Sequence, residues 1–349
     1  MQYRPLGTTE MMVSEIGFGT GDNAGLIIRG TPEDQLASVV RALELGVNYF
    51  DTSPDYGRTG IAETNLGKIF KELGVRPFVT TKVEIMPEDL DDIAGKVVRS
   101  VDESLKRLQL EWVDVVQIHN PPRLERHLDV PGWIHLSVDD YLGPNGGLEG
   151  LERVRQAGKV RYLGMACEHA DARAVHALLE TYEFKVINMW YDLLNPTGAI
   201  PKPHGMNVHY DYGEMIEDAA YHGAGVAIMR PLAGGTLTDV ATSGGARHPL
   251  AGGGLSRHAD VYAQMVEQGK SMRFLSQPGE HNLSQAAIRF ILSNDSVSTV
   301  IGGYSEVAHL EEAAGCSGEG PLSEENMARV EMVWRSNFGR WESGTWDEV

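Results

Sequence analysis

Four side chains that can hold or move a proton follow short apolar runs in the first third of the chain. Asp51 and Tyr56 come after one run, Lys82 after the next, and His119 after a third. An ammonium beside a phenol stabilises the phenolate, so Lys82 is expected to lower the pKa of Tyr56 from its reference value near 10. The carboxylate of Asp51 would hold the ammonium, and His119 could donate a hydrogen bond to a substrate oxygen. This set could protonate an alkoxide as it forms, or deprotonate an alcohol.

Each of these residues also has an ordinary structural role open to it. Asp51 could cap the following turn, and Tyr56 could be a half-buried aromatic with a wet hydroxyl. Lys82 could be a solvated lysine at a strand end, and His119 could be a core histidine. Four compatible groups at three adjacent strand ends make the chemical interpretation the better one.

The elements that must position these residues are read from alternating apolar and amphipathic segments. We expect strands at Ile16–Gly19, Val47–Phe50, Phe78–Thr81, Trp112–Ile118, Val160–Met165, Lys185–Met189, Gly225–Met229 and Ser298–Ile301. We expect helices at Pro32–Leu45, Ala62–Leu73, Leu90–Leu108, Leu148–Ala157, Ala172–Glu180, Tyr212–Tyr221, Leu283–Leu292 and Glu306–Ala314. This alternation predicts an α/β fold, a single (β/α)8 TIM barrel domain over residues 1–349.

A doubly wound open sheet is the competing architecture. Such a fold usually carries Gly-x-Gly-x-x-Gly after its first strand, and residues 17–22 read Gly-Phe-Gly-Thr-Gly-Asp instead. The barrel is therefore favoured.

Three stretches are too long to be plain connectors: 120–147, 195–211 and 231–282. All three follow strands, so we expect them on the C-terminal face, where barrel enzymes keep their chemistry. The aromatic and acidic tail 334–349 is expected to fold over the same mouth.

Aromatic and histidine side chains in these loops are candidate substrate contacts. Trp133 and Tyr141 lie in the first loop and His209 in the second, and Tyr56 and His119 would complete the pocket. Stacking surfaces mixed with hydrogen-bond donors favour a polyhydroxylated ring or a polar polycyclic ketone.

Composition limits the other function classes. The 349 residues are 42% hydrophobic and 23% charged, with a formal net charge of −19. A surface this acidic disfavours nucleic-acid and membrane partners, and no run reaches the ~18 apolar residues of a membrane span. Two cysteines, Cys167 and Cys316, cannot form a disulfide framework and suit a reducing compartment, so we expect a cytoplasmic protein. The sequence makes no prediction of oligomeric state.

Several motifs resemble the aldo-keto reductase superfamily over nearly the whole chain. Residues 3–20 are similar to its N-terminal hairpin and first strand, and Gly-Val-Asn-Tyr-Phe-Asp-Thr-Ser with Tyr-Gly at 46–57 is similar to its most diagnostic signature. Residues 105–119 resemble the segment that leads to the family histidine. Residues 231–237 resemble the loop along the cofactor pyrophosphate, and 299–312 resemble the last strand and the loop at the adenosine end.

The resemblance implies a nicotinamide-dependent carbonyl reductase without a metal, acting on a small-molecule carbonyl or alcohol. It makes Tyr56 the general acid, gives Lys82 and Asp51 the task of tuning it, and lets His119 position the carbonyl. All four positions hold the expected residue types, which disfavours a non-catalytic relative such as a channel-associated subunit.

The resemblance also implies a set of cofactor contacts. They are Gly19, Thr20, Asp51, Asn188, Met229, Arg230, Pro231, Leu232, Gly234, Gly303, Ser305, Glu306 and His309. The family default is NADP(H).

Some of these positions depart from the family pattern. Where many members have Ser-Asn after the fifth strand, this chain has Ala166 and Cys167, and Met229 stands where an aromatic commonly stacks on nicotinamide. Methionine packs against a ring more loosely.

The adenosine end departs as well. Ser305 stands where many members have an arginine for the 2′-phosphate, and Glu306 adds a carboxylate. Both changes weaken binding of a phosphate dianion, so NAD(H) stays open, although Arg230 or Arg273 could restore phosphate binding.

Two other functions stay open. The same chemistry could run oxidatively, as an NAD-linked sugar or alcohol dehydrogenase. A metal-dependent barrel isomerase or hydrolase is more remote, with ligands from Glu84, His119, Glu168 and His169, since no His-x-His or His-Glu-x-x-His spacing occurs.

Overall fold

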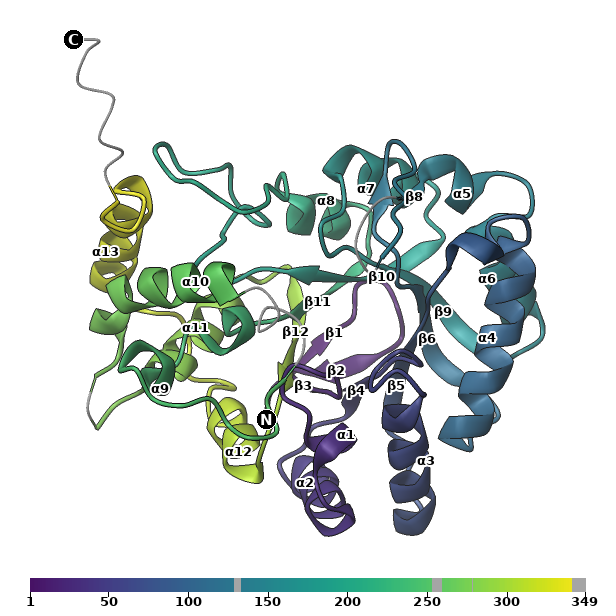
Figure 1. Ribbon diagram of the computed structural model, residues 1–349, viewed down its shortest axis with the longest axis horizontal. Helices are drawn as coiled ribbons and strands as arrows, with labels where there is room; N and C mark the ends of the chain where they lie inside the picture. Colours follow the sequence, from purple (N-terminus) through teal and green to yellow (C-terminus); the bar gives the residue numbers. More distant parts are fainter. Residues whose placement is uncertain (129–132, 253–258, 278, 341–349) are drawn as a thin grey trace.

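Parallel strands close into a barrel in the computed structural model, which describes residues 1–128, 133–252, 259–277 and 279–340 (Figure 1). Around the barrel the strands follow chain order: β3 (Ile16–Gly19), β4 (Tyr49–Asp51), β5 (Phe78–Val83), β6 (Val113–Ile118), β9 (Val160–Ala166), β10 (Phe184–Trp190), β11 (Gly225–Met229) and β12 (Val297–Gly303). The predicted (β/α)8 architecture is therefore confirmed.

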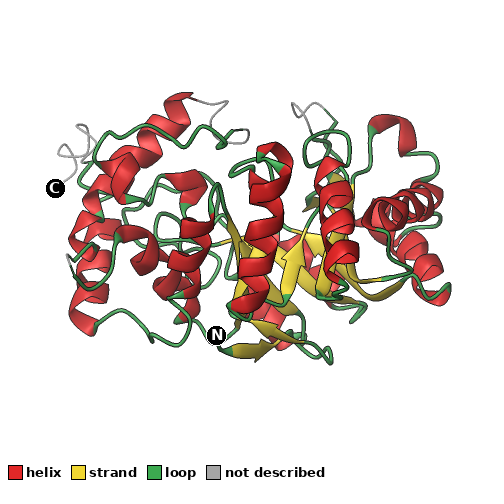
Figure 2. Cartoon of the chain, turned by 90° about the horizontal axis from the view of Figure 1, so that it is seen from below, coloured by secondary structure: helices red, strands yellow, loops and turns green. Residues whose placement is uncertain are grey.

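The helices that connect successive strands surround the barrel, as Figure 2 shows with the strands enclosed among them. They are α2 (Pro32–Glu44), α3 (Ile61–Leu73), α4 (Ile93–Leu108), α6 (Gly147–Gln156), α7 (Ala172–Leu179), α8 (Met215–Tyr221), α11 (Leu283–Leu292) and α12 (Val307–Ala314). Polar caps fix several starts: Thr31 accepts from the Asp34 amide, and Asn282 accepts from the Gln285 amide. Among the described residues, no helix has the length and apolar character needed to cross a membrane.

The N-terminal hairpin, β1 (Tyr3–Pro5) and β2 (Met12–Ser14), closes one end of the barrel. Its apolar side chains pack with residues of the barrel strands in one buried cluster that includes Leu6, Met11, Val13, Tyr49, Val115 and Val186. Gly7 makes the close approach possible, because it has φ +55° and a Cβ there would lie 2.3 Å from the backbone nitrogen of Gly225. The opposite end, where the strands terminate, is left for a site.

Two of the three long stretches contain elements that periodicity did not predict. Residues 120–147 hold β7 (Pro122–Arg123), β8 (Leu136–Ser137) and α5 (Val138–Leu142). Residues 231–282 hold η2 (Ala233–Gly235), α9 (Asp239–Thr242), α10 (Ala259–Ser271) and η4 (Arg273–Leu275). Residues 195–211, all of which the structure describes, have no helix or strand. Two further short elements, α1 (Leu26–Arg29) and η1 (Pro87–Asp89), follow β3 and β5.

The tail begins inside α13 (Glu324–Arg335). Trp334 is buried, and its indole nitrogen donates to the carbonyl of Leu193, 2.8 Å away. Residues 336–340 continue beside the 195–211 loop, where Asn337 accepts from the amide of Asn207. The rest of the predicted lid, residues 341–349, lies outside the described residues.

Candidate active site

A buried ion pair joins the ends of two neighbouring strands. Asp51 is the last residue of β4, and Lys82 lies one residue before the end of β5. The Lys82 Nζ atom is 2.6 Å from Asp51 Oδ1 and donates a second hydrogen bond to the carbonyl of Thr52, at 3.0 Å. The two side chains are 1% and 5% exposed. Because a buried charge is costly without a partner, each residue depends on the other.

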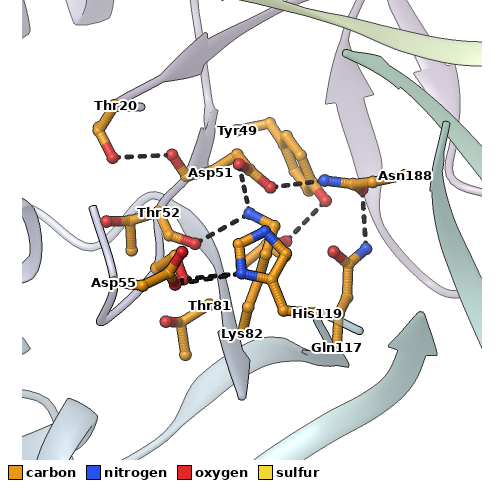
Figure 3. Close-up of polar contacts among 12 residues, drawn as sticks. Thr20, Tyr49, Asp51, Thr52, Asp55, Thr81, Lys82, Gln117, His119 and Asn188 are labelled. Atoms are coloured by element: carbon orange, nitrogen blue, oxygen red, sulfur yellow. Dashed lines mark hydrogen bonds and ion pairs between the residues drawn. The ribbon is translucent and has the colours of Figure 1, made fainter. Parts of the chain in front are cut away.

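Two amides extend this pair across the barrel (Figure 3). The Asn188 Nδ2 atom donates to the second oxygen of Asp51 at 2.7 Å, and Gln117 Nε2 donates to Asn188 Oδ1 at 2.7 Å. The structure thus places Asn188 in support of Asp51, where the resemblance implied a cofactor contact. Gln117 was not predicted, since a glutamine in the middle of an apolar strand gives no sequence signal.

Tyr56 lies next to the ion pair. Lys82 Nζ is 5.0 Å from the centre of its ring. Burial raises the pKa of Tyr56 well above its usual value, and the carboxylates of Asp51 and Asp55 add to the rise. The prediction of a lowered pKa at Tyr56 is therefore wrong for this structure, because burial and the nearby carboxylates raise it. The phenol stays protonated and is available as an acid.

His119 is oriented by a carboxylate (Figure 3). Its Nδ1 atom is 3.1 Å from Asp55 Oδ1 and 3.3 Å from the hydroxyl of Ser53. Burial opposes ionisation of Asp55, but the charge and hydrogen bond of His119 outweigh it and hold the pKa of Asp55 well below its usual range. An ionised carboxylate only accepts, so Nδ1–H donates to Asp55, and Nε2 can donate to a substrate oxygen only when it carries a second proton. Asp55 stands one residue before Tyr56, and the sequence reasoning passed over it.

Aromatic rings border the same site. The His119 ring lies edge-on to Trp133, with centroids 4.3 Å apart, and edge-on to Tyr56 at 5.9 Å. This agrees with Trp133 as a pocket residue. Tyr141 differs: it is fully buried and donates to the carbonyl of Asn120 at 2.6 Å. It belongs to the core, because α5 packs it inward, and this corrects its proposed substrate role.

A second ion pair stands beside Tyr56. Glu168 Oε1 is 2.8 Å from Arg230, whose guanidinium lies 4.7 Å from the ring centre of Trp190. Glu168 raises and Arg230 lowers the pKa of Tyr56, so the pair is close enough to act on it. Arg230 therefore lies at the catalytic end, where it pairs with Glu168, and it is not available to a phosphate at the expected adenosine end. Arg273 lies exposed in η4.

The strand ends and the loop after β11 hold the residues that the resemblance assigns to the nucleotide. Thr20 follows Gly19 and donates twice to the carbonyl of Asp51, which ties the end of β3 to the end of β4. After Pro231 and Leu232, the loop turns through Ala233, Gly234 and Gly235 with φ of 48°, 70° and 91°. The amides of Ala233 and Gly235 donate to the carbonyls of Arg230 and Leu232, at 2.9 and 2.8 Å, so they hold the turn itself. A Cβ at Gly235 would meet no atom within 4 Å, so open space borders the turn, as a bound pyrophosphate would require.

At the adenosine end that the resemblance implies, Ser305 is buried, whereas Glu306 and His309 are exposed. Ser305 turns inward and donates to the carbonyl of Ala24 at 2.8 Å, so its hydroxyl is already engaged. Glu306 is 53% exposed and lies 3.4 Å from His309 and 3.8 Å from His248. At Gly303, a Cβ would meet only Ala24, at 3.2 Å. Met229 ends β11 beside Trp190 at the other end of the expected nucleotide site.

The residues proposed for a metal site do not gather. Within the described part of the chain, three ligand atoms come within 4.8 Å of one another only at His176, Asp218 and His222. These lie on α7, on α8 and just after α8, and none is among the ligands proposed from the sequence. The geometry therefore does not support the metal-dependent alternative.

Comparison with known proteins agrees with this site. The model of the Aldo/keto reductase family matches residues 15–335. The chain is 28% identical over 344 residues to an Arabidopsis thaliana protein named L-galactose dehydrogenase, covering 95% of this chain and 94% of that protein. It is 23% identical over 346 residues to L-glyceraldehyde 3-phosphate reductase of Escherichia coli K12, covering 95% and 92%.

A solved structure, aldo-keto reductase AKR11C1 from Bacillus halodurans in its holo form, superposes with a TM-score of 0.68 at 24% identity, covering 98% of this chain and 99% of that one. Members of the matched family are NAD(P)-dependent oxidoreductases that act on carbonyl groups. This chain belongs to the aldo/keto reductase family.

Proposed function

We propose that this enzyme reduces the carbonyl group of a polar, sugar-like or polycyclic small molecule to an alcohol, with Tyr56 as the general acid. The buried Asp51–Lys82 pair beside Tyr56 carries the proposal. Replacing a buried ion pair by apolar residues is often neutral or stabilising. The presence of this pair beside Tyr56 therefore supports a role in the chemistry of the phenol.

The chain's own residues handle the proton and the orientation. Bound NAD(P)H supplies a hydride to the carbonyl carbon. Tyr56 gives its proton to the carbonyl oxygen as negative charge develops there, while His119, with its Nδ1–H held by Asp55, donates to that oxygen from Nε2 when the ring carries both protons. The ammonium of Lys82 stabilises the phenolate left on Tyr56.

For the cofactor, we propose that the loop over Pro231, Leu232 and Gly234 holds the pyrophosphate and that Met229 packs on the nicotinamide. Glu306, open to solvent and without an arginine beside it among its described contacts, supports NADH as well as NADPH. The two buried thiols, Cys167 and Cys316, support our prediction of a cytoplasmic enzyme.

The oxidative direction is the second candidate. The relative named L-galactose dehydrogenase favours it, and the same relative supports a sugar-like substrate. Tyr56 would then accept the alcohol proton.

The test is fluorescence titration with NADPH and NADH, followed by oxidation of the better cofactor with a carbonyl panel. We expect binding of at least one cofactor, turnover with wild type and loss of turnover in Tyr56→Phe. Tyr221→Phe, at a position 84% exposed, is the matched control and should keep wild-type rates. Binding of neither nucleotide would overturn the proposal.

A further inference from the structure

A cavity of about 150 Å³ lies between the end of β10, the 195–211 loop and α10. Trp190 and Asp192 form one wall, Tyr210 lies on the loop side, and Met265 of α10 lies opposite. A space of this size admits one six-membered ring. The reaction proposed above uses none of these four side chains.

The cavity lining combines aromatic faces with groups that donate and groups that accept hydrogen bonds. Trp190, Tyr210 and Tyr212 supply aromatic surface, while Gln264 and Gln268 of α10 supply amides. An amide both donates and accepts, and such a mixture recognises hydroxyl groups, which also do both. Sites with aromatic walls and a few convergent polar groups are typical of small-molecule subsites.

His169 gives the clearest sign that a ligand is expected. Its Nε2 atom is buried without a hydrogen-bond partner, although the residue lines the cavity. An unsatisfied buried nitrogen is costly, and a ligand hydroxyl would satisfy it. Burial lowers the pKa of His169, so the ring is neutral at physiological pH. His209 borders the same space, with its ring 5.7 Å from that of His169.

The charges around the cavity disfavour an anion. No lysine or arginine lines it among the residues that the structure describes. The two nearby cations are engaged: Arg123 donates to the Tyr210 hydroxyl at 2.8 Å, and Arg230 pairs with Glu168. A phosphate or carboxylate ligand would find no free cation in the lining to pair with.

The cavity adjoins the catalytic centre. Arg230 packs over Trp190, one wall of the cavity, and Glu168 directly precedes His169. The Glu168–Arg230 pair also acts on Tyr56, so it lies near both the acid and the cavity. A ligand could present one end to Tyr56 and rest its other end in the cavity.

We infer that this cavity is a subsite for the end of the substrate remote from the carbonyl, and that it takes an uncharged polyhydroxylated ring such as a pyranose. This inference rests on the proposed carbonyl reduction and adds the class of the remote group.

The experiment compares three aldehydes with wild-type enzyme: 2-methoxybenzaldehyde, 2-formylphenyl β-D-glucopyranoside and the 6-phosphate of that glucoside. We expect kcat/KM for the glucoside to exceed that for the plain aldehyde at least tenfold, and the phosphate ester to gain nothing further. Met265→Trp fills the cavity and should bring the glucoside-to-aldehyde ratio close to one. Met332→Trp, at a position 66% exposed on α13, is the control and should keep the wild-type ratio.

Each outcome decides a different question. Reduction of the plain aldehyde without a glucoside advantage overturns the subsite and leaves the carbonyl reductase intact. A tenfold advantage for the phosphate ester over the glucoside overturns the uncharged class. No reduction of any aldehyde with either cofactor counts against the proposed function itself. If Met265→Trp does not fold, Val261→Phe obstructs the same wall and is read in the same way.

Discussion

The two ends of the expected nucleotide site differ in the burial of their charged residues. At the catalytic end, Asp51 and Lys82 are buried, hydrogen-bonded and joined to Asn188. At the adenosine end, Glu306 is 53% exposed and lies 3.4 Å or more from its histidine partners. The catalytic end is a buried hydrogen-bonded network, whereas the expected adenosine end carries exposed charges.

The difference teaches where sequence change is tolerated. Removing one partner of a buried pair leaves an uncompensated charge, whereas an exposed pair contributes little in water. We therefore expect few substitutions to be tolerated at the catalytic end. At the expected adenosine end, changes such as Ser305 in place of an arginine, or a carboxylate at Glu306, should cost little stability. Cofactor preference can therefore change while the catalytic residues stay the same.

Tyr56→Phe tests the catalytic end most severely. Loss of a positioned general acid costs about 10²–10⁴-fold in rate. We expect that loss in kcat/KM for reduction, with the Kd for the cofactor within twofold of wild type, since the ring is kept. A comparable loss of cofactor binding would show that Tyr56 builds the nucleotide site rather than the chemistry.

Lys82→Met tests whether the ion pair holds the fold together. The change leaves Asp51 buried and unpaired, and we expect the free energy of unfolding to fall by about 3–5 kcal/mol in urea titration. Lys106→Met removes a lysine from an exposed pair with Glu103 and should change it by less than about 0.5 kcal/mol. Equal effects of the two variants would contradict the contrast between buried and exposed charges.

Glu306→Arg tests the adenosine end. A guanidinium in place of the carboxylate can pair with a 2′-phosphate, and one charge-assisted bond is worth about 1.5–3 kcal/mol. We expect the ratio of NADPH to NADH affinity to rise roughly tenfold or more in fluorescence titration. Glu325→Arg makes the same charge change at an exposed position on α13 and should leave the ratio alone. An unchanged ratio in both variants would mean that another residue reads the phosphate.

Much of the barrel was predictable because its strands and helices carry local signals. β3 and α11 were predicted with their observed bounds, and the cap that precedes α11, Asn282, is visible in the sequence. The elements inside the long loops were missed for a physical reason. α10 and α5 are short or weakly patterned, and tertiary contacts rather than periodicity hold them.

The site was predictable in its residue types and less so in their surroundings. Tyr56, Lys82 and His119 come together as expected, with Asp51. The pKa of Tyr56 was predicted with the wrong sign, because the net field depends on Asp51 and on burial, which no sequence pattern reports. Tyr141 was misplaced because an aromatic in a loop can face either way.

Asp51→Asn tests that field through a shift in a pH limb. The variant also leaves the Lys82 charge buried without its carboxylate, so its folding is first checked by urea titration. The Asp51 carboxylate helps to raise the pKa of Tyr56, so removing it lowers that pKa and leaves the ammonium of Lys82 to act on the phenol unopposed. Because reduction needs the protonated phenol, kcat/KM falls as pH rises through that pKa, and in Asp51→Asn this alkaline limb moves to lower pH. The measurement is the pH profile of kcat/KM for wild type and variant, with exposed Asp295→Asn as the control that keeps the wild-type limb. A limb that stays in place in Asp51→Asn would mean that the Asp51 carboxylate does not help to set the pKa of Tyr56.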